Sequence, residues 1–342
     1  RTIRNKISTP RNLMSPVESE TCWVLTEGKA GMENQCLGLA EAVGLPITVK
    51  RARLRAPWKW LAPHGIGDAL QHLAPGSARL APPWPRLLIA CGRQSIPLAV
   101  AIKRASGGKT FLVQTQHPRV NLAPFDLVVP PLHDGLDGPN VMPILGAPHR
   151  VNAARLAEAK EKWRTLFAPR PCPRVAVIIG CKSKTLELPK ERAAAIADML
   201  SARARGGASL MVTLSRRTPP ESATILSERL RAAGAYVWDG EGPNPYFGML
   251  AWADAILVTA DSVSMITEAA ATGRPVHIID LPGGSPKFDR FHEEMGRRGV
   301  TRPFRGRIES WRYLPLNETA RVAAEIRRRI GVTQAQGRVT AA

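Results

Sequence analysis

Short apolar runs alternate with amphipathic stretches along this chain, which is the pattern expected of a sheet covered by helices. Residues 21–44 begin with an apolar run, turn at glycines and continue at helical spacing to Gly44, a typical helix end. Residues 86–108 repeat this strand-loop-helix order. Three further apolar runs follow at 110–115, 125–131 and 141–146. Together these segments predict a mostly parallel sheet in the first half of the chain.

A second series of alternating elements follows a proline-rich boundary. A polar-faced helix is predicted over 151–167, and the next stretch, 168–174, carries three prolines in seven residues. The elements predicted after it are strands at 175–180, 209–214, 235–238, 255–259 and 276–280 and helices at 190–205, 220–233, 246–252 and 263–272. Two successive halves of this kind predict an α/β protein with two Rossmann-like domains that face each other across a cleft.

The length of 342 residues also favours two domains, because a single hydrophobic core rarely grows to that size. The expected organisation is a flexible extension at 1–20, a first domain at 21–150, a connecting helix and linker at 151–174, a second domain at 175–317, and a closing helix and tail at 318–342. Pro10 and Pro16 interrupt the basic extension, so it does not match an amphipathic mitochondrial targeting segment.

The charge of the chain favours an anionic partner. Lys and Arg number 48 against 28 Asp and Glu, a formal net charge of +20. Aromatic residues are only 5% and nucleic-acid-binding motifs are absent from the sequence, so nucleic acid is not the expected partner. Five cysteines without a C-x-x-C pair, and no apolar run of about 20 residues, predict a cytoplasmic protein whose contact with a membrane would be peripheral.

The loop after the first predicted strand carries two candidate general bases. Ligands of open α/β sheets bind at the carboxyl ends of the strands, where Gly28 and Gly31 allow the backbone to approach a ligand closely. Glu27 and Glu33 lie in the same loop and at the start of the following helix. Carboxylates at this end of a helix are also favoured by its dipole alone, so a purely stabilising role is the alternative.

Basic side chains follow several other predicted strands. Gly92 would let the backbone approach a ligand, and Arg93 beside it would reach an anion or be solvated. Lys184 follows the first strand of the second half, where it would donate to a phosphate. Arg216 and Arg217 follow the next strand and form either a phosphate grip or a solvated face.

The stretch TADSVSMITE places an acid and two hydroxyls between a strand and a helix. Ser262 is not a hydrolase nucleophile, because its flanks do not form a G-x-S-x-G elbow. The free N–H groups of a helix N-terminus, with Ser262 and Ser264, would suit a diphosphate. Glu268 lies one turn deeper on the same face and would accept hydrogen bonds from ribose hydroxyls. The alternative is that Asp261 or Ser262 is simply the helix cap and Glu268 a surface acid.

Residues 50–63 interleave basic and aromatic side chains, a mixture typical of an anionic membrane surface. The tryptophans would equally suit a core. The candidate membrane-facing residues are Arg51, Arg53, Arg55, Trp58, Lys59 and Trp60.

Seven segments resemble, in order, the bacterial relatives of the mitochondrial fission (elongated-mitochondria) family. They are TEGKAGMENQCLGLAEAVG, CGRQSIP, QTQHPRVNLAPFDLVVPPLHDG, NVMPILGAPHRV, SRRTP, DSVSMITEAAATGRPVHIIDLPG and KFDRFHEEM. The resemblance runs from about residue 21 to 320 and is specific as a combination. It implies a GT-B glycosyltransferase-like fold, similar in layout to enzymes that use lipid-linked acceptors. Plant members of the family are associated with recruiting a dynamin-related protein to mitochondria.

The resemblance also implies roles for individual residues. Ser262 and Ser264 would hold the phosphates of a nucleotide-sugar donor and Glu268 its ribose, with Arg216 nearby. Related sequences tend to have a glycine at the position of Cys181, where a Cβ restricts close approach to a phosphate. The sequence has no D-x-D motif, so we expect neither a metal nor a cofactor beyond the nucleotide sugar, and basic groups would meet the leaving-group charge.

Three functions fit these observations. The first is a metal-independent glycosyltransferase that moves a sugar to a lipid-linked or cell-surface glycan acceptor at the cytoplasmic face of the membrane, with Glu33 or Glu27 as the base. The second is a sugar-nucleotide epimerase, and the third is a non-catalytic adaptor in membrane fission. An adaptor needs no donor site, so the pattern of Asp261, Ser262 and Glu268 favours an enzyme.

Overall fold

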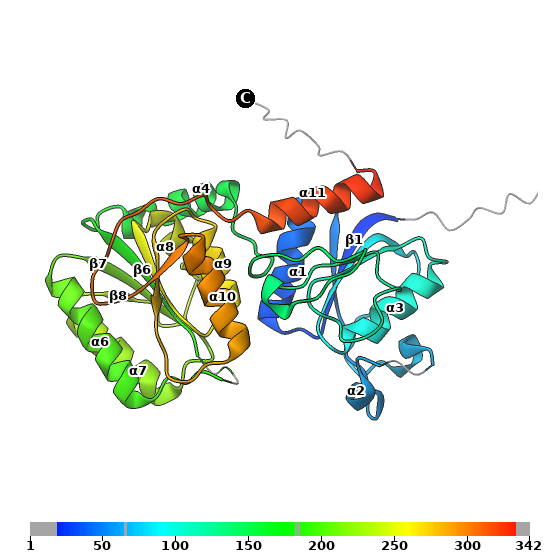
Figure 1. Cartoon of the computed structure of the whole chain (residues 1–342), viewed down its shortest axis with the longest axis horizontal. Coiled ribbons are helices and arrows are strands. Elements are labelled where there is room, and N and C mark those ends of the chain that lie inside the picture. The colour runs from blue at the N-terminus through cyan, green and yellow to red at the C-terminus, as the bar shows by residue number, and fades with distance from the viewer. Residues whose placement is uncertain (1–18, 65–66, 182, 184, 333–342) are drawn as a thin grey trace, which may run out of the picture.

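Two parallel sheets, each covered by helices on both faces, make up the computed structural model (Figure 1), which describes residues 19–64, 67–181, 183 and 185–332. The first sheet has the strand order β2-β1-β3-β4-β5, and we call the part built around it the first lobe. Its strands are β1 (Ser19–Thr26), β2 (Ile47–Arg51), β3 (Pro85–Cys91), β4 (Phe111–Gln114) and β5 (Leu127–Val128). β1 begins inside the stretch expected to be a loose extension, and residues 1–18 of that stretch lie outside the described residues.

The second sheet has the order β11-β10-β9-β6-β7-β8, and the part built around it is the second lobe. Its strands are β6 (Arg174–Ile179), β7 (Ser209–Leu214), β8 (Tyr236–Val237), β9 (Ala255–Thr259), β10 (Val276–Ile279) and β11 (Thr301–Pro303). All neighbouring strands are parallel, so their carboxyl ends lie along one edge of each sheet. The strands predicted for the second half are confirmed within one or two residues.

Successive side chains of a strand point to opposite faces of the sheet, so each lobe has two hydrophobic cores. In β1, Trp23 and Leu25 pack with α3 (Ser95–Ala105), whereas Cys22 and Val24 pack with α1 (Ala30–Val43). In the second lobe, odd-numbered residues of β6 face α6 (Lys190–Arg205) and α7 (Pro220–Ala232). Its even-numbered residues face the other core, which includes α8 (Tyr246–Trp252), α9 (Val263–Ala270) and α10 (Pro286–Arg297).

The expected strand at 141–146 is present only as isolated bridges, Val128 to Val141 and Pro131 to Ile144. The expected strand at 125–131 is correspondingly reduced to Leu127–Val128. Pro130, Pro131 and Pro143 lack the N–H that a ladder needs, so the pairing cannot propagate through them.

Two segments of the chain cross from one lobe to the other. α4 (Ala153–Lys162) and α5 (Arg164–Phe167) pack on the second lobe, next to α8. The last helix, α11 (Glu318–Ile330), returns to the first lobe and lies on α1 (Figure 1). α1 also approaches the connecting segment closely, because a Cβ built on Gly38 would lie 2.3 Å from the carbonyl oxygen of His149.

Candidate functional site

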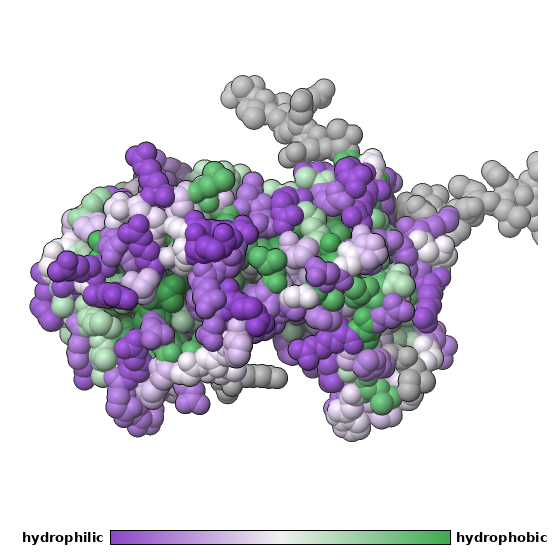
Figure 2. All heavy atoms as spheres, viewed as in Figure 1, coloured by the Kyte–Doolittle hydropathy of each residue, from purple (hydrophilic) through white to green (hydrophobic). Residues whose placement is uncertain are grey.

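A cleft of about 1490 Å³ opens between the lobes at the carboxyl ends of second-lobe strands. Its second-lobe wall includes the ends of β6 and β7, the loop at 215–217 and Trp238 after β8. The opposite wall is the loop at 28–31 together with Asn34. Gly28 adopts φ +87°, a conformation that glycine tolerates without strain. Figure 2 shows a notch between the two lobes at the lower edge of the view.

Cationic side chains line this cleft from both lobes. Lys29 lies 3.6 Å from Glu27, and Arg217 lies 3.7 Å from the buried carboxylate of Asp261. Arg216 pairs with no carboxylate in the described part of the chain. Its guanidinium is therefore available to an anionic ligand. Lys184, predicted to join this group, lies outside the described residues.

The start of α9 lies next to the cleft, which Met265 lines. The alternative that Ser262 caps this helix is confirmed, because its hydroxyl accepts a hydrogen bond from the N–H of Met265 at 3.4 Å. Ser264 accepts a hydrogen bond across the lobes from the Gln35 side chain at 3.3 Å. Binding of donor phosphate by these serines stays a prediction.

Asp261 has a different role from the one expected. Its side chain is buried, with the residue 3% exposed, and accepts hydrogen bonds from the Cys181 N–H at 2.6 Å and from the Thr259 hydroxyl at 2.7 Å. The Thr259 hydroxyl in turn accepts the N–H of Gly180 at 2.8 Å. Asp261 thus ties the loop after β6 to β9, and we no longer expect it to contact a donor.

The same contacts explain the backbone at Cys181. This residue adopts φ +99°, which is rare for a side chain with a Cβ. Its N–H points at the Asp261 carboxylate, which holds the loop in that conformation. The Cys181 amide is therefore occupied by the protein and is not offered to a phosphate.

Glu268 lies behind the cleft wall and contacts it through Tyr246. Tyr246 lines the cleft at the start of α8, and its hydroxyl donates to a carboxylate oxygen of Glu268. Burial raises the pKa of Glu268 to about 7, and the hydrogen bond from Tyr246 partly opposes this rise. The carboxyl group therefore titrates near neutral pH at the position where a ribose was predicted to bind.

The two candidate bases have different surroundings. Glu33 receives two hydrogen bonds of 2.7 Å from the guanidinium of Arg51, and these lower its pKa. Glu27 has a side chain only 8% exposed and accepts the Gln94 N–H at 2.9 Å. Gly92 lies against it, because a Cβ there would be 3.1 Å from its Oε1. The contact with Arg51 makes Glu33 a weaker proton acceptor than a free glutamate.

Arg93 does not face an anion site. Its guanidinium donates to the carbonyl oxygens of Ala62 at 2.8 Å and Lys59 at 2.9 Å. It therefore binds the carboxyl end of α2 (Trp58–Leu61), where unpaired carbonyls attract a cation. The expectation that Arg93 reaches a ligand is corrected accordingly.

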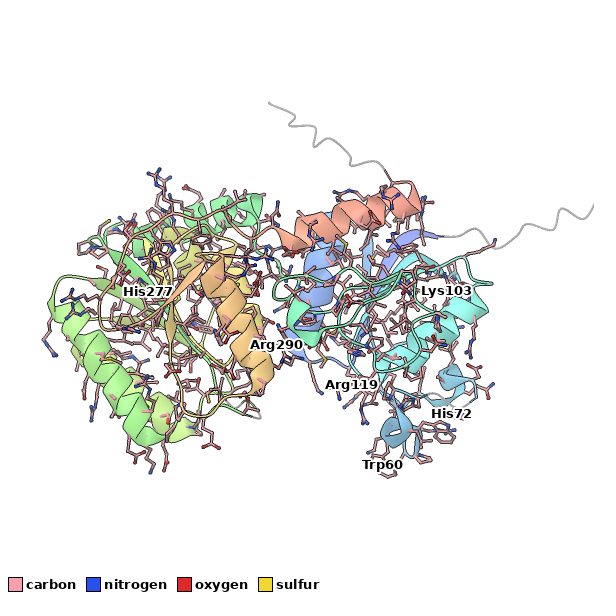
Figure 3. All side chains as sticks on the ribbon, viewed as in Figure 1. Trp60, His72, Lys103, Arg119, His277 and Arg290 are labelled. Atoms are coloured by element: carbon pink, nitrogen blue, oxygen red, sulfur yellow. The ribbon has the colours of Figure 1, made fainter. Side chains whose placement is uncertain are left out.

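The basic and aromatic segment is divided by the fold. Trp58 stacks on His72 with ring centres 3.7 Å apart, and Arg51 is engaged by Glu33. Trp60 is 65% exposed, Leu61 is 42% exposed, and Figure 3 shows Trp60 at the far tip of the first lobe. We call Trp60 and Leu61 the apolar tip. The remaining members of the predicted patch, Arg53, Arg55 and Lys59, lie beside it on the same segment.

Several residues that line the cleft or bridge it were not predicted. Trp238, Asn244 and Tyr246 come from the segment WDGEGPNPY, which follows β8 and in which no site residue was predicted. Its place after a strand, with two glycines, was the available signal. Gln35, which bridges to Ser264, carried no such signal, because an amide in the first turn of a helix is ordinary.

The described part of the chain contains neither a metal-binding cluster nor a helix that could span a membrane. No three or more His, Cys, Asp or Glu side chains there are grouped so that they could hold a metal ion. No helix of residues 19–64, 67–181 or 185–332 is both long and apolar enough to cross a bilayer.

Comparisons with known proteins connect this geometry to a family. The model of the family described as mitochondrial fission ELM1 matches residues 30–330. Mitochondrial fission protein ELM1 of Arabidopsis thaliana is 31% identical, over 90% of each chain. An uncharacterized protein of Rickettsia prowazekii, RP120, is 26% identical, over 89% of this chain and 97% of its own.

A solved structure with the same fold is UDP-GlcNAc 2-epimerase of Methanocaldococcus jannaschii, in complex with UDP-GlcNAc and UDP. It superimposes with a TM-score of 0.51 at 10% identity, covering 91% of this chain and 99% of its own. The predicted GT-B-like arrangement of two Rossmann-like domains is thereby confirmed.

Proposed function

This chain belongs to the mitochondrial fission ELM1 family, and we propose that it is an enzyme that uses a nucleotide sugar. The observation that carries the proposal is the cleft of about 1490 Å³, which lies at the carboxyl ends of β6 and β7 and is lined by Arg216, a residue with no carboxylate partner among those that the structure describes. A ligand with a flat base, a ribose and two phosphates matches a cleft that is lined by the aromatic rings of Trp238 and Tyr246 and by arginines. The UDP complex of the epimerase with this fold agrees with such a ligand.

The donor would lie along the second lobe. Arg216 and Arg217 would contact the diphosphate, close to the amino end of α9 and its two serines. Tyr246 and Glu268 would meet the ribose, and Trp238 would lie near the base. The sugar would then point across the cleft towards the loop at 28–31.

The reaction we propose is transfer of the sugar to a lipid-linked or glycan acceptor at a membrane surface. The acceptor oxygen forms a bond to the anomeric carbon as the bond from that carbon to the diphosphate oxygen breaks. The acceptor proton passes to Glu27, which is not clamped by an arginine as Glu33 is. Arg216 would stabilise the charge of the departing nucleoside diphosphate without a metal ion.

Nucleotide binding is the first test. We expect UDP, GDP or another nucleoside diphosphate to raise the melting temperature, by the equivalent of about 2.7 kcal/mol at a hundredfold excess over Kd. Arg216→Gln should abolish the shift, whereas Arg305→Gln, which removes an exposed arginine outside the cleft, should keep it. A chain that responds to no nucleotide would favour the non-catalytic alternative, an adaptor in membrane fission, which agrees with the name of the Arabidopsis relative, a mitochondrial fission protein.

Turnover separates the two enzymatic alternatives. A transferase releases nucleoside diphosphate in proportion to acceptor, whereas an epimerase changes the nucleotide sugar with no acceptor present. Glu27→Gln should then slow transfer by about 100-fold or more while nucleotide binding is kept, and Glu33→Gln should have the smaller effect. Full activity in both variants would place the base elsewhere.

A further inference from the structure

Gln35 is a buried amide of the first lobe whose side chain reaches the second lobe. It lies in α1, is 9% exposed, and donates from its side-chain nitrogen to the hydroxyl oxygen of Ser264 in α9 at 3.3 Å. The residues next to these two in the sequence, Asn34 and Met265, line the cleft from opposite lobes. The hydrogen bond therefore lies at the edge of the cleft, where the lobes meet.

Two donors of the first lobe hold the Gln35 amide in one orientation. The Gln116 side-chain nitrogen donates to the Oε1 atom of Gln35 at 3.3 Å, and the Cys91 thiol donates to the same oxygen at 3.9 Å. Because both donors meet the oxygen, the NH₂ group of Gln35 is directed at Ser264. Cys91 ends β3 and Gln116 follows β4, so the carboxyl edge of the first sheet supports this side chain.

The contact determines what the Ser264 hydroxyl can do. A hydroxyl has one hydrogen to donate and two lone pairs that accept. The Gln35 N–H occupies a lone pair of Ser264, which leaves the hydroxyl hydrogen to be donated to another group. Accepting this bond also polarises the O–H and strengthens the bond that it donates. Ser264 lies in the first turn of α9, at the positive end of the helix dipole, where the favoured recipient is an anion.

We propose that Gln35 is a positioning residue for the diphosphate of the nucleotide: it holds Ser264 so that the hydroxyl donates to a phosphate oxygen. This inference rests on the proposed function, in which the diphosphate lies between α9 and the arginines of the cleft, Arg216 and Arg217. The two partners belong to different lobes, so a bound diphosphate favours the arrangement in which the lobes meet at this contact. A nucleoside without phosphates gains nothing from it.

Titration of the full chain with UDP and with uridine tests the proposal, with GDP, ADP and CDP and their nucleosides in parallel. Gln35→Met keeps the length of the side chain and removes its hydrogen bonds. We expect it to weaken the diphosphate about tenfold and to leave the nucleoside unchanged. Gln35→Glu still accepts from Gln116 and Cys91 but cannot donate to Ser264, and it should weaken the diphosphate more. Equal losses for diphosphate and nucleoside would mean a merely structural role and would overturn the proposal.

A double-mutant cycle shows whether Gln35 acts through Ser264. Ser264→Ala removes the hydroxyl and should weaken the diphosphate about tenfold or more. In that background Gln35→Met should change the affinity by less than about twofold, because the group that it positions is gone. Losses that multiply in the double variant would show that the two residues act independently, and the proposal would be wrong.

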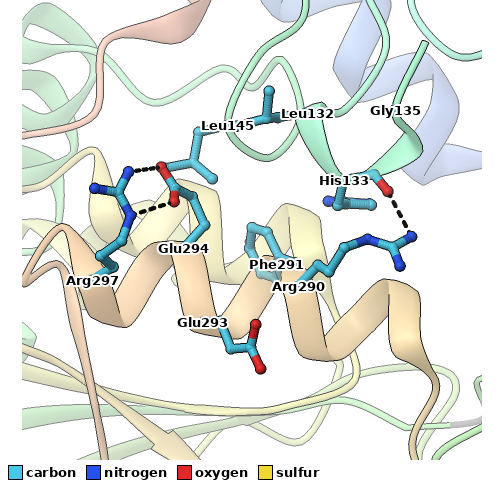
Figure 4. Close-up of a pocket in the computed structure, with 9 residues that line it drawn as sticks. All are labelled: Leu132, His133, Gly135, Leu145, Arg290, Phe291, Glu293, Glu294 and Arg297. Atoms are coloured by element: carbon cyan, nitrogen blue, oxygen red, sulfur yellow. Dashed lines mark hydrogen bonds and ion pairs between the residues drawn. The ribbon is translucent and has the colours of Figure 1, made fainter.

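Arg290→Met is the matched control. The Arg290 guanidinium makes another hydrogen bond between the lobes, to the carbonyl oxygen of His133 at 3.1 Å (Figure 4), and it does not line the cleft. This variant should bind the diphosphate as the wild type does. A loss equal to that of Gln35→Met would show that any bond between the lobes has this effect, which contradicts a specific role for Gln35.

Failure of this inference is distinguishable from failure of the proposed function. A wild-type chain that binds no nucleoside diphosphate would overturn both. Binding by the wild type with unchanged affinity in Gln35→Met would overturn the role of Gln35 alone and leave the nucleotide site in place.

Discussion

The charge of Glu268, which lies behind the wall of the cleft between the lobes, depends on its burial. Burial raises its pKa from 4.5 to about 7. Between these values the folded chain retains a proton that the unfolded chain releases, so this group makes stability fall as the pH rises through that window. Glu268→Gln removes the effect. We expect the melting temperature of the variant, relative to wild type, to increase from about pH 5 to about pH 8; parallel curves would contradict this.

Asp261 was predicted to be a site residue, but its carboxylate holds the backbone of the loop after β6 in place. In Asp261→Asn an amide replaces the carboxylate that accepts from Cys181 and Thr259, so at least one buried donor loses its partner. We expect a loss of about 1–3 kcal/mol in the free energy of unfolding, measured by urea denaturation. A variant with normal stability and lost nucleotide binding would return Asp261 to the donor site.

These residues lie at the end of the strand where they were predicted, but the sequence does not reveal their hydrogen-bond partners. The stretch from Asp261 to Glu268 was correctly predicted to join a strand to a helix, and Ser262 does cap it. That Asp261 turns towards Cys181, and that Tyr246 meets Glu268, depends on segments far apart in the sequence. Hydrophobic periodicity carries no information about such contacts.

The helix α2 carries two exposed apolar side chains, Trp60 and Leu61. It is only four residues long and is held by Arg93 at its carboxyl end, so its position depends on that contact. Trp58 and Trp60 could not be distinguished from the sequence, because the spacing of the two residues does not show which ring is buried. The structure separates them: Trp58 stacks on His72, and Trp60 is exposed.

We expect the apolar tip to decide any binding to anionic vesicles. Trp60→Ser combined with Leu61→Ser should lower vesicle affinity in a flotation assay with little effect on the melting temperature, since Trp60 is 65% and Leu61 42% exposed. Trp58→Ala is the matched comparison and should lower the melting temperature through loss of its stacking on His72. Unchanged vesicle binding in the double variant would contradict the proposal that the protein acts at a membrane surface.

The two lobes are joined by chain segments that cross from one lobe to the other and by hydrogen bonds between the lobes. Gln35 contacts Ser264, and Arg290 contacts the carbonyl of His133. The order of strands and helices predicted two Rossmann-like units, because the alternation of these elements is a local property of the sequence. It did not predict that α11 packs on the first lobe. An apolar stripe on a helix indicates that this face is buried, but it does not identify the element that covers the face.

Removing α11 tests this arrangement. Val322, Ala323 and Ile326 are fully buried in the core that α1 shares with the first sheet. A chain ending at residue 317 would expose that core, and we expect hydrogen exchange to accelerate throughout β1 and α1 while β6 and β9 stay protected. Uniform protection in both lobes would show that the first lobe does not need the helix.

The return of α11 also affects the order in which the protein can fold on the ribosome. Domains usually fold as they emerge, amino-terminal first, at synthesis rates of about 5–20 residues per second. Here the first lobe lacks part of its core until the last helix is made, whereas the second lobe needs only residues already released. The first half to be synthesised is therefore the last to be completed, and until then its apolar surface around Leu39 is open to chaperones.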